Sequence, residues 1–293
     1  MTAKLKYALI FQDNNYIGPE YYFHLNHNNY KPDLIIAVGK FTASQDNIEL
    51  ERTKGLWQKK IIPKNEKIYK FKSCKDNQLW ELISKNNIDL IIQGGAGFIF
   101  TRKMISSAKI GVLNIHPGKL PNYRGNSAPE WAIYSDDEVY LTAHMIDEGI
   151  DTGPIIKEKI LNYRGFDSYY KLRANIYAHC SEVLIDSLEI INKNIPGGTF
   201  FIKQKEDQAK YWSRISESKL IIVKNKFVNF LNLNLSLKIL KSEDIDPNYL
   251  DWFADSDVLR YSDNQYRKIS LNNCKNYVDE CFMSSNVDLY GIF

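Results

Sequence analysis

Apolar and polar positions alternate along the first half of the chain in a way that predicts strands and helices in turn. Short apolar runs rich in β-branched residues predict strands at 6–11, 34–39, 67–71, 88–94 and 112–116. Between them lie amphipathic stretches, clearest at 77–85, where Leu79, Trp80, Leu82 and Ile83 recur at helical spacing. Strands that alternate with helices are typical of a parallel sheet covered by helices.

The pattern continues beyond residue 126 with a helix at 128–134, strands at 140–146 and 154–160, and a long helix at 169–192. The segment Pro196-Gly197-Gly198 follows that helix, and proline and glycine both end helices. We therefore predict an α/β fold, a Rossmann-like parallel or mixed sheet flanked by helices, with a small C-terminal extension.

Three polar residues near the centre of the chain are candidates for catalysis. Asn114 and His116 are two residues apart on a predicted strand, so their side chains point to the same face. Pro117 and Gly118 end that strand, and ligands of open α/β sheets bind where strands end. The third residue is Asp151, in the turn-like segment 147–154.

This pattern resembles the N10-formyltetrahydrofolate-dependent formyltransferases, which include the glycinamide ribonucleotide, methionyl-tRNA and nucleotide-sugar enzymes. The shared features are Asn-x-His, Leu120-Pro121, Arg124-Gly125 and Asp151-Thr152-Gly153, in that order. The resemblance covers about the first two-thirds of the chain. It implies the formyltransferase fold, a catalytic domain at 1–196, and a subdomain or linker at 197–241 that completes the acceptor site.

The resemblance also implies roles for the three candidates. Asn114 would donate hydrogen bonds to the developing oxyanion, and His116 would accept or shuttle a proton at neutral pH. Asp151 would orient His116 or relay the proton through water. The structural alternatives are a buried histidine bonded to backbone and an ordinary turn aspartate. His24, His27, His144 and His179 have no comparable sequence context, and we expect them to be solvated or structurally satisfied.

Residues for the two substrates follow from the same resemblance. For the folate cosubstrate the expected residues are Gly97, Phe98, Phe100, Asp147, Gly149 and Ile150. For the acceptor they are Asn14, Tyr16, Tyr123, Arg124, Asn126, Tyr211 and Trp212. The alternatives are a tight turn for the glycines of 94–97, an ordinary strand-to-helix loop for 12–18, and simple packing for the aromatic pair.

The last third of the chain changes character. Segment 242–261, with its Leu250-x-Trp252 and Asp255-x-x-Val258-x-x-Tyr261 spacing, resembles the opening of a GNAT acetyltransferase. We expect 242–293 to be a truncated GNAT-like domain without activity, or alternatively a C-terminal cap. The apolar stretch 231–240 could form a homodimer interface or an edge strand.

Composition excludes several classes of protein. The 293 residues are 44% hydrophobic and 25% charged, with a net charge of +3, too balanced to require nucleic acid as a partner. No apolar run is long enough to span a bilayer and no signal peptide is evident, so a cytoplasmic protein is expected. The four cysteines are scattered, which favours reduced thiols and no metal site.

The leading hypothesis is formyl transfer from N10-formyltetrahydrofolate to the amine of a UDP- or dTDP-linked amino-deoxysugar, in bacterial glycan synthesis or on the way to a nonulosonic acid such as pseudaminic acid. Pro-Gly-Lys before Leu120, where the tRNA enzymes carry Ser-Leu, favours a sugar acceptor over transfer RNA. A methionyl-tRNA formyltransferase-like enzyme and a formyltetrahydrofolate hydrolase are the enzymatic alternatives. A silent nucleotide-binding module is the non-enzymatic one.

Overall fold

The structure, a computed structural model, describes residues 5–194, 201–231, 237–247, 250, 270–284 and 290–292. Its internal contacts divide the chain into two compact units, residues 1–230 and 231–293. The domain limits expected at 196 and 241 stay predictions. Each unit is described by itself below.

A seven-stranded mixed sheet forms the centre of the first unit, in the order β3-β2-β1-β4-β5-β7-β8. The strands are β1 (Tyr7–Asp13), β2 (Leu34–Lys40), β3 (Ile68–Phe71), β4 (Leu90–Gln93), β5 (Gly111–His116), β7 (Val139–Met145) and β8 (Ile155–Leu161). The pairs from β3 to β5 are parallel, whereas β5-β7 and β7-β8 are antiparallel. The predicted Rossmann-like mixed sheet is confirmed.

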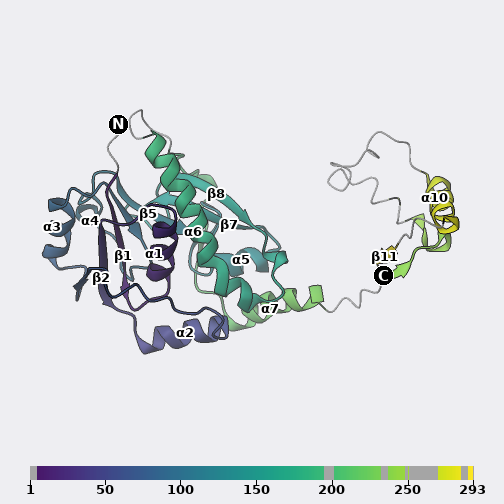
Figure 1. The fold of residues 1–293 in the computed structure, drawn as a ribbon, viewed down its shortest axis with the longest axis horizontal. Coiled ribbons are helices and arrows are strands. Elements are labelled where there is room, and N and C mark those ends of the chain that lie inside the picture. Colours follow the sequence, from purple (N-terminus) through teal and green to yellow (C-terminus); the bar gives the residue numbers. More distant parts are fainter. Residues whose placement is uncertain are drawn as a thin grey trace. The chain divides into compact units, whose positions relative to one another are not determined.

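Helices cover both faces of this sheet (Figure 1). They are α1 (Ile17–His27), α2 (Ala43–Thr53), α3 (Asn77–Lys85), α4 (Arg102–Ile105), α5 (Ala128–Tyr134), α6 (Tyr169–Asn194) and α7 (Glu217–Leu231). Side-chain alternation along β1 builds both cores, because Leu9 packs in one buried cluster with residues of α1 and α6 and Ile10 packs in the other with residues of α3.

Local signals explain where two of these helices begin. Thr42 and Gln45 form a reciprocal capping box at the start of α2. The Asp76 side chain accepts a hydrogen bond from the Gln78 amide at the start of α3. The predicted helices at 77–85 and 128–134 are confirmed at α3 and α5.

Residues 201–230 pack against the sheet and helices that precede them in the first unit. Residue Ile202 forms an isolated antiparallel bridge with Ile155. After η2 (Glu206–Gln208), the short strand β9 (Tyr211–Trp212) pairs in parallel with β6 (Arg124–Gly125). Helix α7 buries Val223 and Phe227 in the larger core. Residues 201–230 therefore belong to the same compact unit as the sheet.

In the second unit, β10 (Leu237–Ile239) pairs antiparallel with β11 (Tyr290–Ile292), and the unit also contains η3 (Ser242–Asp244) and α10 (Leu271–Met283). Residues 251–269, which hold most of the GNAT-like segment, lie outside the described residues. Helices within the described ranges are all too short or too polar to span a bilayer.

Candidate active site

Antiparallel pairing of β5 with β7 places Asn114 directly opposite His144. The Asn114 Nδ2 atom lies 3.0 Å from His144 Nε2, and His144 Nδ1 lies 3.0 Å from the Met145 carbonyl oxygen. In the tautomer that this network assigns, Nδ1–H donates to that carbonyl and Nε2 accepts from Asn114. One amide hydrogen of Asn114 therefore remains for another acceptor.

Asp151 joins this pair from the loop between β7 and β8. Its Oδ2 accepts a hydrogen bond of 2.8 Å from the Gly125 amide and lies 3.5 Å from His116 Nδ1. Its Oδ1 lies 3.6 Å from His144 Nε2. The backbone of Asp151 is left-handed, with φ of 54°, a conformation that non-glycine residues rarely adopt and that clusters at functional sites. The structure thus brings together Asn114, His116 and Asp151, with His144 as a fourth member.

The protonation of His116 follows from its burial and its neighbours. Its Nε2 lies 2.6 Å from the Tyr123 carbonyl oxygen, so the proton of the neutral ring sits on Nε2 and Nδ1 faces Asp151. Burial lowers the pKa of His116 below its ordinary 6.5, although the Asp151 carboxylate and the Tyr123 carbonyl oppose this. Burial alone would raise the pKa of Asp151, but His116, His144 and the Gly125 amide hold it at about 2. At neutral pH the pair is a neutral imidazole beside a carboxylate.

A cavity of about 530 Å³ opens beside these residues. Asn114, His116 and Asp151 line it together with loop residues 95–99 and Ile150. A second hollow of about 130 Å³ adjoins it, lined by Asn114, His144 and Asp151. All six residues expected for the folate lie on these walls: Gly97, Phe98 and Ile150 on the larger cavity, and Phe98, Phe100, Asp147, Gly149 and Ile150 on the smaller. Their role stays a prediction.

Asn15 holds the 94–97 loop in shape from the end of β1. Its buried side chain donates hydrogen bonds of 2.8 and 2.9 Å to the carbonyl oxygens of Gly94 and Gly95, and accepts one of 3.0 Å from the Gly18 amide. Gly95 has φ of 80°, and a Cβ there would lie 2.6 Å from Asn15 Nδ2. A glycine is therefore required where the loop passes Asn15.

The residues expected for the acceptor are less concentrated. Asn126 lines the 530 Å³ cavity, and none of the other six lines either cavity described so far. Asn14 is exposed, and Tyr16 is buried against Trp57 with ring centroids 4.8 Å apart. Tyr123 stacks on Trp212 at 5.6 Å. These three rings pack against other parts of the unit, and the acceptor role of the seven residues stays a prediction.

Arg124 is fully buried and has internal partners. Its guanidinium donates hydrogen bonds of 3.0 and 2.8 Å to Gln204 Oε1, of 3.0 and 2.7 Å to the Glu206 carboxylate, and of 3.2 Å to the Tyr211 hydroxyl. These bonds use the Nε, Nη1 and Nη2 atoms of the guanidinium. Arg124 fastens the 124–126 segment to the returning chain and does not face the cavity.

Two residues that shape the site were not predicted from the sequence, Gln204 and His144. Gln204 donates hydrogen bonds of 2.9 and 2.7 Å to the carbonyl oxygens of Asp151 and Gly153, while its Oε1 accepts from Arg124. His144 bridges Asn114 and Asp151. The predicted strand at 140–146 was a partial signal for His144, because pairing with 112–116 would place it beside Asn114. No local signal distinguishes Gln204.

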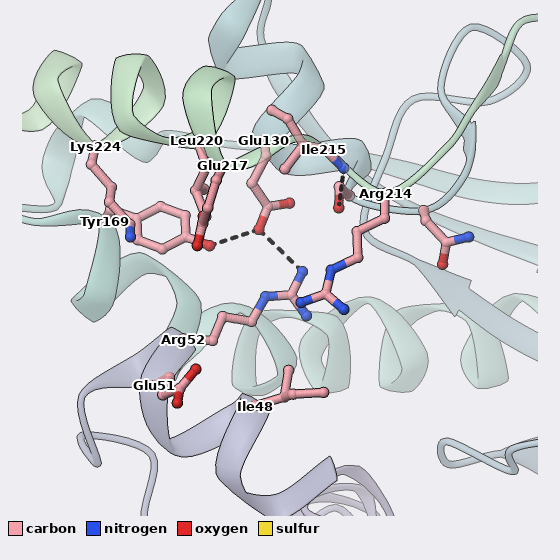
Figure 2. A pocket seen from close by; sticks show the side chains of 12 residues that line it. Ile48, Glu51, Arg52, Glu130, Tyr169, Arg214, Ile215, Glu217, Leu220 and Lys224 are labelled. Carbon is pink, nitrogen blue, oxygen red and sulfur yellow. Dashed lines mark hydrogen bonds and ion pairs between the residues drawn. The ribbon is translucent and has the colours of Figure 1, made fainter. Parts of the chain in front are cut away.

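A further cavity, of about 610 Å³, lies next to the first and shares Arg52, Asn126 and Ser127 with it. Figure 2 shows its walls, which come from α2, α5, the start of α6 and the start of α7. Among the described residues no group of His, Cys, Asp or Glu side chains is arranged to hold a metal ion.

Known proteins resemble the first unit in sequence and in fold. A family model described as Formyl transferase matches residues 8–187. A methionyl-tRNA formyltransferase of Wolbachia pipientis is 29% identical over 133 residues, which are 45% of this chain and 43% of that protein. The chain thus spans less than half the length of that curated relative in the match.

Solved structures share the fold at low sequence identity. A sugar N-formyltransferase from Shewanella is similar with a TM-score of 0.50 and 18% identity over 73% of this chain and 78% of that one. HypX from Aquifex aeolicus is similar with a TM-score of 0.50 and 16% identity over 74% of this chain and 32% of that one.

Proposed function

The chain belongs to the formyl transferase family, and from that premise we propose that it moves a formyl group from N10-formyltetrahydrofolate to the amine of a nucleotide-linked amino sugar. The observation that carries the proposal is the convergence of Asn114, His116 and Asp151 on one cavity wall. Formyl transfer to an amine needs an oxyanion donor and a proton acceptor in one place, and this wall offers both.

In the proposed reaction the amine nitrogen attacks the formyl carbon, and the carbonyl oxygen takes the negative charge. The remaining Nδ2 hydrogen of Asn114 donates to that oxygen. His144 holds the amide in place through its 3.0 Å hydrogen bond, so little rearrangement is needed as charge develops. This preorganised donor is the part of the site that stabilises the transition state.

The proton of the attacking amine goes to the His116–Asp151 pair. Nδ1 of His116 is the basic nitrogen, because Nε2 is bound to the Tyr123 carbonyl. Asp151 lies 3.5 Å away and stabilises the imidazolium that forms. When the carbon–N10 bond breaks, N10 takes that proton from the His116 imidazolium, so the products are the formamide and tetrahydrofolate and His116 is neutral again.

The cavity walls fit the formyl donor. The loop at 95–99 and Ile150 stand on the same 530 Å³ cavity as the three polar residues, and Ile99 and Ile150 are exposed there. Apolar side chains beside backbone N–H and C=O groups suit the flat faces and polar edge of a pterin. In the proposal the folate binds between these loops with its N10 end toward Asn114.

The adjoining 610 Å³ cavity supports a small acceptor such as an amino sugar, because its volume is in the range of small-molecule sites. Methionyl-tRNA is the second candidate, because curated relatives carry that name. A formyltetrahydrofolate hydrolase is the third, since water can replace the amine.

The test is incubation of the purified protein with N10-formyltetrahydrofolate and, separately, UDP- and dTDP-linked amino sugars or methionyl-tRNA, followed by mass detection of product. We expect a one-formyl mass increase on an amino sugar, lost in His116→Ala and kept in the control His27→Ala, whose ring lies exposed on α1. Formate release without a formylated acceptor would refute transfer in favour of hydrolysis.

A further inference from the structure

We propose that the 610 Å³ cavity binds a phosphorylated, hydroxyl-bearing part of the acceptor, with Arg214 and Lys224 as the phosphate-binding residues. The link between this cavity and catalysis rests on the proposed function. The phosphate site itself is inferred from polar groups on the cavity wall that lack an ion pair or a hydrogen bond.

Two cations on the cavity wall have no anionic partner. Arg214 projects into the cavity just before α7, and Lys224 stands on α7 itself (Figure 2). Among the described residues neither makes an ion pair, whereas Arg52 on the same wall pairs with Glu130 at 3.1 Å. Lys224 lies over the rings of Tyr169 and Tyr170, at 5.8 and 5.5 Å from their centroids, which directs it along the wall.

A buried carboxylate on the same wall has one oxygen without a hydrogen-bond partner. Glu130 is 1% exposed; its Oε1 accepts from the Tyr169 hydroxyl at 2.9 Å and from Arg52 at 3.1 Å, while its Oε2 has no partner. Burial alone would raise the pKa of Glu130, but Arg173 and Arg52 hold it at about 2, so the group is ionised. An unsatisfied buried acceptor is costly, and a ligand hydroxyl would satisfy it.

Glu51 and Glu217 are two further carboxylates on the wall. Like Arg214 they are exposed to solvent, so water and salt screen all three charges, whereas Lys224 is half-buried. A ligand that carries phosphate for the free cations and hydroxyls for Glu130 matches the wall. A sugar phosphate or nucleotide has both groups, whereas an apolar or purely cationic ligand has neither.

Position links this cavity to the chemistry. Arg52, Asn126 and Ser127 line both cavities. The segment that carries Asn126 and Ser127 is held fixed, because Asp151 accepts a hydrogen bond from the Gly125 amide and Ser127 Oγ accepts one of 3.3 Å from the Ile215 amide. A ligand anchored by Arg214 can therefore extend past Asn126 to His116. In this assignment the phosphate is bound by Arg214, in the segment that follows residue 200, and not by Arg124.

The experiment is calorimetric titration of the full chain with UDP, dTDP and pyrophosphate. We expect the nucleotides to bind, with affinity at least about tenfold lower in Arg214→Gln and lower still in Arg214→Gln/Lys224→Gln, since charge-assisted hydrogen bonds to phosphate are lost. Arg164→Gln is the matched control, because Arg164 is an exposed arginine with no ion pair among the described residues. The affinity for 5-formyltetrahydrofolate, measured on the same samples, should not change in any variant.

Two results would overturn the assignment: nucleotide affinity in Arg214→Gln equal to that in Arg164→Gln, or wild-type protein that binds methionyl-tRNA but none of the three phosphate probes. Either result would leave formyl transfer itself to the separate His116→Ala test. Conversely, Arg214-dependent nucleotide binding without any formylated product would support the cavity assignment and refute the proposed reaction.

Discussion

At the scale of single residues, the proposed reaction depends on keeping His116 neutral. Burial lowers its pKa below 6.5, and Asp151, with a pKa of about 2, stays a carboxylate over the whole working range. The His116 ring should therefore become protonated only below pH 6.5. Asp151→Asn removes the charge that raises the pKa of His116, so in that variant the ring should become protonated at still lower pH. NMR titration of the His116 ring measures both effects without the acceptor amine, whose own protonation would add an acid limb to kcat/KM. A titration midpoint at or above 6.5 would contradict them.

At Gly118 a single added carbon atom would disturb the packing around His116. A Cβ there would lie 2.6 Å from the Ala128 Cβ and 2.7 Å from His116 Nε2. Gly118→Ala must therefore displace the imidazole or the start of α5, and we expect kcat/KM to fall about 100-fold or more, as small misplacements of catalytic groups do. At Gly165 the nearest atom would be 3.7 Å from an added Cβ, so Gly165→Ala should be close to wild type in activity. Equal activity of the two variants would argue against tight packing around His116.

At the scale of elements, the loop that carries Asp151 is held by a segment that follows the sheet in the sequence. Gln204 donates to the carbonyl oxygens of Asp151 and Gly153 and accepts from Arg124. Gln204→Glu keeps the acceptor but places a second oxygen against the two carbonyls, so the Asp151 loop should loosen and kcat should fall about tenfold or more. The control is Gln208→Glu on η2, where the side chain is exposed. Steady-state kinetics of both variants tests this prediction. An unchanged kcat in Gln204→Glu would show that Gln204 is not needed to position the Asp151 loop.

At the scale of the whole molecule, the contacts assign residues 201–230 to the unit that contains the sheet. A chain ended after residue 231 should therefore fold and keep formyl transfer. A chain ended after residue 200 loses Gln204, Trp212, Val223 and Phe227, and should unfold at a much lower temperature or not fold. Thermal unfolding of both chains tests this. Loss of the fold in the longer one would mean that unit 1 depends on residues beyond 231.

Local patterning was enough to predict most of the sheet, helices α3 and α5, and the shared face of Asn114 and His116, whereas Asp151 was assigned to the same site through the formyltransferase resemblance. Strand alternation places Asn114 and His116 on one face whatever the neighbouring strands are, and the amphipathic spacing at 77–85 is a property of that segment alone. The six residues expected for the folate lie on two loops next to those strands, so they too reached the cavity walls.

What the sequence by itself determined is therefore local: which segments are strands or helices, and which polar side chains leave the end of β5. Only the tertiary structure decided which distant groups meet there. Pairing of β5 with β7 brought His144 to Asn114, and the return of the chain after residue 200 buried Arg124 against Gln204 and carried Arg214 to the 610 Å³ cavity. The physical reason is that strand pairing and long-range packing are set by the combined burial of many segments, which the periodicity of one segment does not encode.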